Sequence, residues 1–145
     1  GIALSTTDEQ FFRNLFGGDR VPGQEIERIL TLVSLDKPPD TLATDLSYGQ
    51  RKLLDLAIAI AKPHSLLMLD EPVAGVNPRL REEIKAILRR LNAEGETILL
   101  IEHDMNFVMD LVDHIIVMDA GQVIAEGPPA DIRNDPKVLE AYLGG

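Results

Sequence analysis

The hydrophobic pattern of the chain changes partway along its length. In the first part, apolar residues recur at helical spacing between Ile26 and Val33, and clusters of Gly and Pro separate such short stretches. A longer amphipathic pattern begins after Ser47, a residue typical of helix N-caps, and ends at Pro63. The pattern therefore predicts a helical subdomain over residues 1–62.

The second part alternates between short apolar runs and amphipathic stretches. The runs 66–69 and 97–101 are almost wholly apolar, which is typical of strands buried on both faces of a parallel sheet. Between them, Asn77 and Pro78 mark the start of a helix that Gly95 closes. The order of strand, helix and strand predicts a βαβ unit with parallel strands and a right-handed crossover.

The C-terminal pattern predicts a β-hairpin flanked by short helices. The expected elements are a helix near 104–111, strands at 114–119 and 123–125 joined by a turn at Ala120-Gly121, and helices after Pro128 and Pro136. The sequence thus predicts an α/β fold in which residues 63–145 form the α/β core.

Composition narrows the class of protein. The chain has 145 residues, of which 45% are hydrophobic and 26% charged, as expected for a packed globular domain. Its net charge of −10 argues against non-specific binding to nucleic acid or anionic lipid, because both require a basic face. The absence of Cys excludes disulfides and thiolate metal sites. No apolar run is long enough to predict a membrane span.

Two acidic residues follow the first apolar run. Ligands of open parallel sheets bind beyond the carboxyl ends of the strands, where Asp70 and Glu71 are expected. Carboxylates at such a place need compensation, and Mg²⁺ on Asp70 with a water oriented by Glu71 would provide it. This arrangement is typical of nucleotide hydrolysis. In the alternative interpretation, both carboxylates only cap the turn before Pro72.

His103 follows the second apolar run. If the strands are neighbours, we expect it in register with Glu71, where an imidazole can bond a phosphate oxygen. An alternative is a metal phosphohydrolase that uses the pair His103-Asp104 with His64 and His114. That class holds its ligands on helices, whereas His103 is expected at the end of a strand, so the pattern disfavours it.

The segment from Ser47 to Gln50 opens the long predicted helix. Helix N-termini present backbone N–H groups to anions, and Gly49 permits close approach of the main chain to a phosphate. Ser47 and Gln50 also have the spacing of a capping box, which gives an equally good structural explanation. The two interpretations stay open at this point.

The order of these three segments resembles the ABC-transporter ATPase family. The signature motif matches Leu46–Gln50, the Walker B motif Leu66–Asp70, the D-loop Ala74–Asn77 and the switch histidine His103. Within the family, phrases such as Leu-Asp-Glu-Pro-Val-Ala-Gly-Val-Asn-Pro resemble the ATP-binding subunits of branched-chain amino acid importers. The resemblance implies a partial P-loop NTPase fold with a parallel sheet, a small helical subdomain and a C-terminal hairpin.

The resemblance also implies roles for individual residues. In the family, two ATP-binding subunits face each other, as a homodimer or heterodimer, and ATP held by one is covered by the signature segment of the other. Glu71 and His103 would then be catalytic, and Asp70 would hold Mg²⁺ through water. The side of the site that covers the ATP of the facing subunit would be formed by Ser47, Tyr48, Gly49, Gln50 and Asn77.

Three features depart from the family pattern. Tyr48 stands where Gly is more common, and Asn77 where Asp is more common. No Gly-Lys dipeptide occurs in the chain, so the phosphate-binding G-x-x-x-x-G-K-[ST] loop (Walker A) is missing. We therefore expect the chain to correspond to the C-terminal part of an importer ATPase and, by itself, neither to bind ATP well nor to hydrolyse it.

Partners and location follow from the same resemblance. It implies transmembrane permease subunits as partners, no nucleic acid, and a cytoplasmic position, peripheral on the inner face of the cell membrane. One alternative is a non-catalytic half-domain that pairs with a complete ATPase. Another is a chromosome-associated or repair ATPase, but such proteins flank these motifs with long heptad segments that this sequence lacks, and the acidic charge disfavours DNA.

Overall fold

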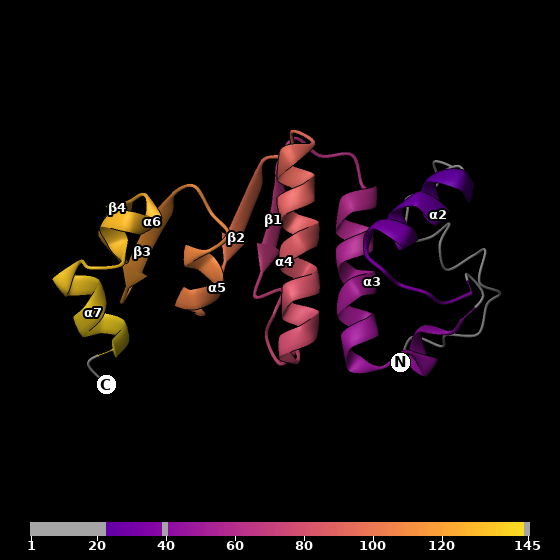
Figure 1. Ribbon diagram of the computed structural model, residues 1–145, viewed down its shortest axis with the longest axis horizontal. Helices are drawn as coiled ribbons and strands as arrows, with labels where there is room; N and C mark the ends of the chain where they lie inside the picture. The colour runs from indigo at the N-terminus through magenta and orange to yellow at the C-terminus, as the bar shows by residue number, and fades with distance from the viewer. Residues whose placement is uncertain (1–22, 39–40, 144–145) are drawn as a thin grey trace. The chain divides into compact units, whose positions relative to one another are not determined.

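The computed structural model of the protein describes residues 23–38 and 41–143 (Figure 1). They form two compact units, an N-terminal unit ending at Ile101 and a C-terminal unit beginning at Glu102. The subdomain boundary expected at residue 62 lies inside the N-terminal unit and stays a prediction. Among the described residues, no helix combines the length and the apolar character needed to cross a bilayer.

The N-terminal unit begins with two packed helices. Helix α2 (Gly23–Leu32) and helix α3 (Tyr48–Ala61) contact each other, and a single 3₁₀ turn, η1 (Ala43–Asp45), lies between them in sequence. Burial of Ile29 and Leu30 confirms the apolar face predicted for the first helix, and Val33, directly after the helix, is buried as well. Both helices were expected from helical spacing of apolar residues, and both are present.

The predicted βαβ unit is confirmed. Strand β1 (Leu67–Asp70) is followed by helix α4 (Pro78–Ala93) and strand β2 (Ile98–Ile101), and the two strands pair in parallel. Asn77 caps α4 by accepting a hydrogen bond from the Leu80 N–H at 3.0 Å. Gly95 follows the helix with φ of 101°, a conformation that favours glycine.

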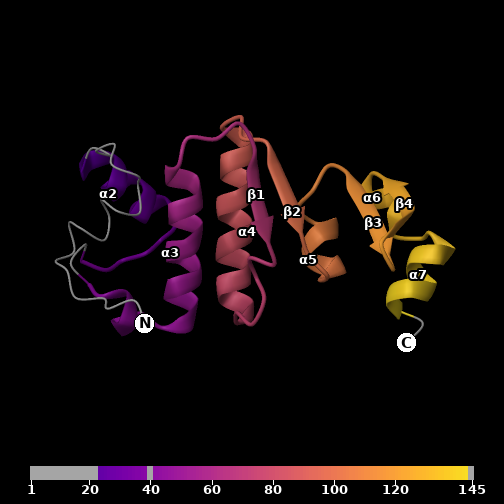
Figure 2. The ribbon, with the colours of Figure 1, turned by 180° about the vertical axis from the view of Figure 1, so that it is seen from behind.

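One face of the β1–β2 pair carries exposed apolar side chains. Leu67 and Leu69 are buried, but Met68 is 62% exposed and the β2 residues Leu99 and Ile101 are 44% and 54% exposed. The expectation of strands buried on both faces is therefore wrong for this chain. Successive side chains alternate between the faces of a sheet, and α4 covers only one face of the pair (Figures 1 and 2).

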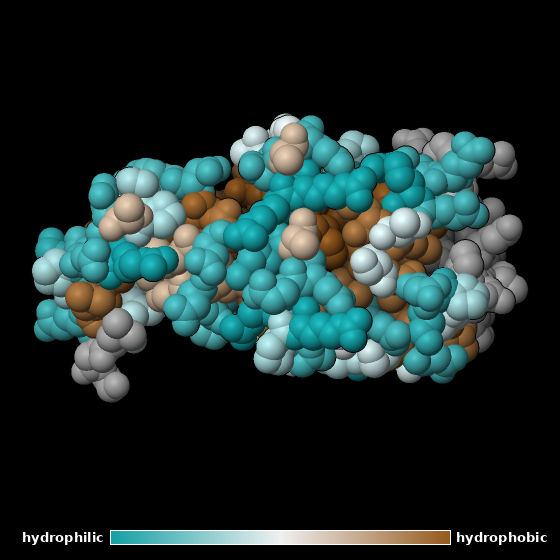
Figure 3. All heavy atoms as spheres, in the orientation of Figure 1, coloured by the Kyte–Doolittle hydropathy of each residue, from teal (hydrophilic) through white to brown (hydrophobic). Residues whose placement is uncertain are grey.

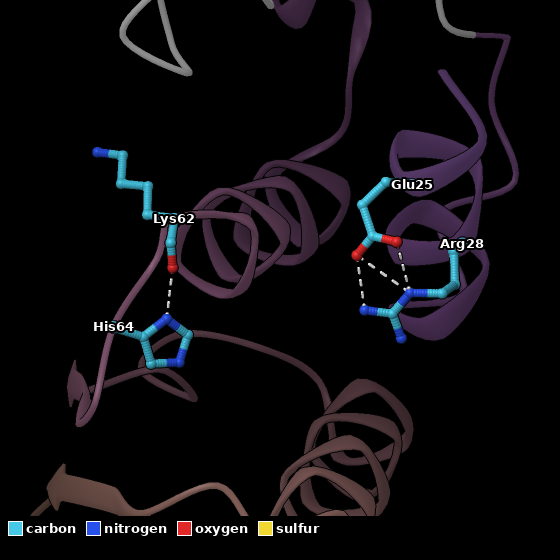
Figure 4. Close-up of polar contacts among 4 residues, drawn as sticks. All are labelled: Glu25, Arg28, Lys62 and His64. Carbon is cyan, nitrogen blue, oxygen red and sulfur yellow. Dashed lines mark hydrogen bonds and ion pairs between the residues drawn. The ribbon is translucent and has the colours of Figure 1, made fainter. Parts of the chain in front are cut away.

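The helices of this unit turn polar side chains outward. In Figure 3 the outer face of α4 is hydrophilic, while its residues Ile84 and Leu88 are each 1% exposed on the opposite face. Figure 4 shows an ion pair on α2, in which the Arg28 guanidinium donates to the Glu25 carboxylate at 2.8 Å. This ion pair joins residues three positions apart on the exposed side of α2, as expected for an amphipathic helix.

The C-terminal unit is a hairpin with short helices. Helix α5 (Met105–Met109) is capped by the Asp104 side chain, and β3 (Ile115–Asp119) pairs antiparallel with β4 (Gln122–Gly127). Helices α6 (Pro129–Ile132) and α7 (Pro136–Leu143) contact β4. The predicted elements are all present, although β4 is longer than expected. The buried cluster of the unit consists of Ile115, Val117, Ile132 and Val138.

Candidate functional site

The acidic pair lies at the carboxyl end of β1. Asp70 is the last residue of the strand, Glu71 follows it, and both are exposed. Glu71 has a φ of 45°, which places a residue other than glycine in the left-handed region. Its N–H donates to the Ile101 carbonyl oxygen at 2.9 Å. The strand therefore ends with a carboxylate on a sharp, strained turn at the edge where ligands of parallel sheets bind.

The start of α3 contacts the turn that follows β1. The Lys52 Nζ donates to the Glu71 carbonyl oxygen at 3.4 Å, and the Tyr48 hydroxyl donates to the Ala74 carbonyl oxygen at 2.9 Å. The structure thus brings together two segments that the sequence separates by more than twenty residues. Their proximity within one chain was not predicted. The helical spacing of Tyr48 and Lys52, one turn apart, was the only sequence signal for it.

Two glycines permit this close approach. A Cβ atom at Gly49 would lie 2.7 Å from Leu80 Cδ2, so a side chain there would collide with the first turn of α4. Gly75 has φ of 71°, and a Cβ atom there would lie 3.2 Å from the Tyr48 hydroxyl oxygen. Gly49 therefore has a packing role in this chain, independent of any approach to phosphate.

The capping interpretation of the Ser47 segment is confirmed as a structural fact. The Ser47 Oγ accepts from the Gln50 N–H at 3.3 Å, and the Gln50 Oε1 accepts from the Ser47 N–H at 2.9 Å. This capping box uses the side chains of Ser47 and Gln50 in hydrogen bonds to the backbone. Other backbone N–H groups of the first helical turn have no partner within the helix, as at any helix N-terminus. Anion binding by Ser47, Tyr48, Gly49 and Gln50 is compatible with it and stays a prediction.

His103 lies in the C-terminal unit. The pairing of β1 with β2 ends with Asp70 opposite Ile101, before Glu71 and His103 are reached, so the expected register of these two residues stays a prediction. The His103 side chain is 70% exposed, and its N–H donates to the Glu102 Oε2 at 3.2 Å.

The other two histidines each contact a nearby oxygen atom of their own unit. His64 precedes β1, and Figure 4 shows its Nδ1 facing the Lys62 carbonyl oxygen, while its Nε2 lies 3.2 Å from Glu96. The His114 Nε2 lies 3.1 Å from Glu126. Within residues 23–38 and 41–143, no group of three or more His, Cys, Asp or Glu side chains could hold a metal ion. The described residues therefore give the metal phosphohydrolase alternative no support.

The acidic pair nevertheless fits one kind of metal. Mg²⁺ is commonly held by one or two protein carboxylates, with water and substrate phosphates completing its shell. Asp70 and Glu71 supply hard oxygen ligands on an exposed turn, without an enclosing protein cage. This donor set suits Mg²⁺ delivered with a nucleotide better than a permanent structural metal.

Two family models match the sequence. One is described as "AAA domain, putative AbiEii toxin, Type IV TA system" and matches residues 7–110. The other, described as a branched-chain amino acid ATP-binding cassette transporter, matches residues 122–145. The order of motifs and the match over residues 122–145 point to one family. The chain belongs to the ABC-transporter ATPases.

Individual relatives of this ABC ATPase chain support the same family. The high-affinity branched-chain amino acid transport ATP-binding protein BraF of Pseudomonas aeruginosa is 43% identical over 77% of this chain and 44% of BraF. The branched-chain amino acid transport ATP-binding protein LivG of Archaeoglobus fulgidus is 47% identical over 99% of this chain and 57% of LivG. The chain thus spans about half the length of the curated relatives it matches.

Solved ABC structures share the fold. The ADP conformation of MJ1267, an ATP-binding cassette of an ABC transporter, is 35% identical and superposes with a TM-score of 0.75 over 88% of this chain and 54% of MJ1267. A nucleotide-free ATP-binding cassette from an ABC transporter is 36% identical, with a TM-score of 0.74 over 84% of this chain and 50% of that cassette. The predicted partial P-loop NTPase fold is confirmed, and the family implies nucleotide binding.

Proposed function

We propose that this chain forms the C-terminal part of the ATP-binding subunit of an importer for branched-chain amino acids or related solutes. The observation that carries the proposal is the meeting, at the carboxyl end of β1, of the acidic pair with the signature-like start of α3. Similarity to BraF and LivG over most of the chain supports the class of solute. The complete subunit would use ATP hydrolysis to drive transport.

Within that subunit, each site residue would have a defined task. Asp70 would hold Mg²⁺ through water, which neutralises phosphate charge when the ion is bound. Glu71 would accept a hydrogen bond from the attacking water and orient it toward the γ-phosphate, and His103 would donate a hydrogen bond to a γ-phosphate oxygen. The segment 47–50 and Asn77 would contact the facing subunit and its ATP. Phosphoryl transfer needs such positioning more than covalent chemistry.

The proposal includes partners and a location. The facing ATP-binding subunit, identical or homologous, would complete each nucleotide site, and transmembrane permease subunits would receive the mechanical work. The assembled subunit would therefore lie on the cytoplasmic face of the cell membrane.

The experiment that tests the catalytic assignment uses a complete subunit. The N-terminal part of Archaeoglobus fulgidus LivG is joined to this chain, and ATP turnover is measured with and without Glu71→Gln. We expect turnover to fall by about 10² or more, the typical contribution of a general base, while the affinity for ATP changes little. Glu83→Gln on α4 is the matched control, and it should leave turnover unchanged. Full activity in the Glu71→Gln protein would exclude the assigned role.

A second candidate function is a half-domain that pairs with a complete ATPase without catalysing. It is favoured by the presence of the signature-like segment in a chain that has no Gly-Lys dipeptide. The isolated chain should show no ATP turnover under either proposal. Only the second predicts that adding the chain to complete LivG inhibits or stimulates LivG turnover in a dose-dependent way.

A further inference from the structure

The strained conformation of Glu71 is held by several contacts from different elements. Its N–H is bonded to Ile101 on β2, and its carbonyl oxygen accepts from the Ala74 N–H at 3.2 Å and from Lys52 Nζ at 3.4 Å. A left-handed conformation costs free energy in a residue other than glycine, and it persists only where the surroundings determine it several times over. The turn after β1 meets this condition.

Tyr48 connects the same turn to the start of α3. Its hydroxyl donates to the Ala74 carbonyl oxygen at 2.9 Å, and its ring lies against Gly75, where no side chain intervenes. Lys52 Nζ lies 6.0 Å from the centre of the Tyr48 ring, within reach of a cation–π contact. Tyr48 and Lys52 therefore hold each other and the turn together, from adjacent positions on one face of α3.

We propose that Tyr48 and Lys52 are positioning residues that hold Glu71 in its left-handed conformation and couple it to the signature-like segment. The inference rests on the proposed function, in which Glu71 serves the ATP of its own subunit and Ser47 and Gly49 contact the ATP of the facing one. A displacement of the α3 N-terminus would then change the orientation of Glu71, through the contact of Lys52 with Glu71 itself and the contact of Tyr48 with Ala74 in the same turn. This linkage depends on Tyr48, the residue that departs from the common family pattern.

The linkage is tested first in the 145-residue chain, by NMR hydrogen exchange of single amides. Tyr48→Phe removes only the hydroxyl, and Lys52→Met removes the ammonium group while keeping an unbranched apolar side chain. We expect each to speed exchange of the Glu71 and Ala74 amides about three- to tenfold, the effect of one lost hydrogen bond. Lys52→Arg, which keeps the donor, should restore slow exchange. The amide of Leu88, within α4, should not change.

The chain offers a matched control for the loss of a tyrosine hydroxyl. The Tyr142 hydroxyl in the C-terminal unit also donates to a backbone carbonyl oxygen, that of Met118 at 3.2 Å. Tyr142→Phe should leave exchange at Glu71 and Ala74 unchanged. Equal exchange at these two amides in the wild-type, Tyr48→Phe and Lys52→Met chains would overturn the proposal.

The functional part is tested in the complete LivG chimera. Tyr48→Phe and Lys52→Met should each lower kcat for ATP about three- to tenfold. Lys52→Met should also leave KM nearly unchanged, because Lys52 lies outside the segment that contacts ATP and acts through the orientation of Glu71. A wild-type chimera that hydrolyses ATP while both variants match its kcat would overturn the coupling role. A wild-type chimera without ATPase activity would count against the proposed function instead. The exchange measurements would then still show whether Tyr48 and Lys52 stabilise the turn that contains Glu71.

Discussion

Single residues at the ends of elements determine much of the local structure of this chain. Ser47 and Asn77 each cap a helix through a side-chain oxygen, and Glu71 and Ala120 both adopt a positive φ without being glycine. The caps arise from short-range chemistry, since the accepting oxygen and the donating N–H are three residues apart. The conformation of Glu71 arises from contacts with distant residues, so it could not be inferred from its neighbours.

The ion pair between Glu25 and Arg28 on α2 allows a prediction about the pKa of Glu25. The hydrogen bond from Arg28, together with its charge, holds the pKa of the Glu25 carboxyl below its usual range. A lowered pKa in the folded state means that the pair contributes stability above the ordinary carboxyl pKa and that this contribution is lost as the pH falls through the folded-state pKa. Arg28→Gln should return the pKa of Glu25 toward its usual range.

The pKa of Glu25 is measured by NMR titration of its side-chain carboxyl carbon. The control is Arg79→Gln, which removes the similar i,i+4 pair between Arg79 and Glu83 on α4. It should leave the pKa of Glu25 where it is. An unchanged pKa for Glu25 in the Arg28→Gln chain would contradict the stated cause.

At the scale of elements, α3 and α4 meet where glycine takes the place of a side chain. The Leu80 side chain, in the first turn of α4, packs against Gly49, where there is no side chain. The helix pattern alone predicted both helices, but it did not predict that their first turns touch. Packing between helices depends on which residues face each other, and this is a property of the tertiary structure.

Gly49→Ala tests this contact. The added methyl group collides with the buried Leu80 side chain, and we expect a loss of about 1–3 kcal/mol of unfolding free energy, as for overpacking, partly offset by the better helix propensity of Ala. Urea denaturation of the Gly49→Ala, Leu80→Val and double variants gives the coupling free energy between positions 49 and 80. Recovery of stability in the double variant supports the contact, and simple additivity would contradict it.

The hairpin turn of the C-terminal unit makes a second prediction at this scale. Asp119 pairs with Gln122, so Ala120 and Gly121 form a two-residue loop, and both have positive φ, as in a type I′ turn. Alanine is strained there, whereas Asn tolerates the conformation. Ala120→Asn should therefore raise the unfolding free energy by about 0.5–1 kcal/mol, and Gly121→Ala should lower it. Thermal and urea denaturation measure both, and the same sign for both changes would contradict the turn assignment.

At the scale of the whole molecule, the main observation is the uncovered apolar face of the β1–β2 pair. Parallel sheets are usually covered on both faces, but Met68, Leu99 and Ile101 are exposed in this chain. Exposed apolar surface of this kind favours association. The chain also spans only about half the length of these relatives.

Charging this face should reduce self-association without unfolding the chain. Met68 and Leu99 stand opposite each other in the register, so Met68→Lys with Leu99→Glu places opposite charges side by side. We expect an unfolding free energy within about 1 kcal/mol of the wild type and a smaller weight-average mass in sedimentation equilibrium. Leu69→Ala, at a buried position of the same strand, should cost about 2–5 kcal/mol. A large loss of stability in the double variant would show that the face is buried in solution.

The sequence alone predicted most of the secondary structure. Helical spacing, caps and turn residues act over a few positions, so α3, α4 and the hairpin were expected at nearly their observed bounds. The motif order was equally readable, and it predicted the family that the comparisons show. The position of Asp70 after the first apolar run already suggested a metal residue, and the structure places Asp70 at the end of β1. Its role as a metal residue stays a prediction.

The tertiary structure decided the rest, because it depends on which distant residues meet. A run of apolar residues does not reveal whether both faces of a strand are covered, since burial of Met68 depends on what packs over it. Register depends on where two strands begin, and only the structure shows that β1 and β2 pair from Leu67 opposite Ile98 to Asp70 opposite Ile101. The contacts of Tyr48 and Lys52 with the turn after β1 exist only once α3 lies beside that turn. Local chemistry along the chain therefore determined the elements and the motifs, and packing between them determined the strained Glu71 and its supports.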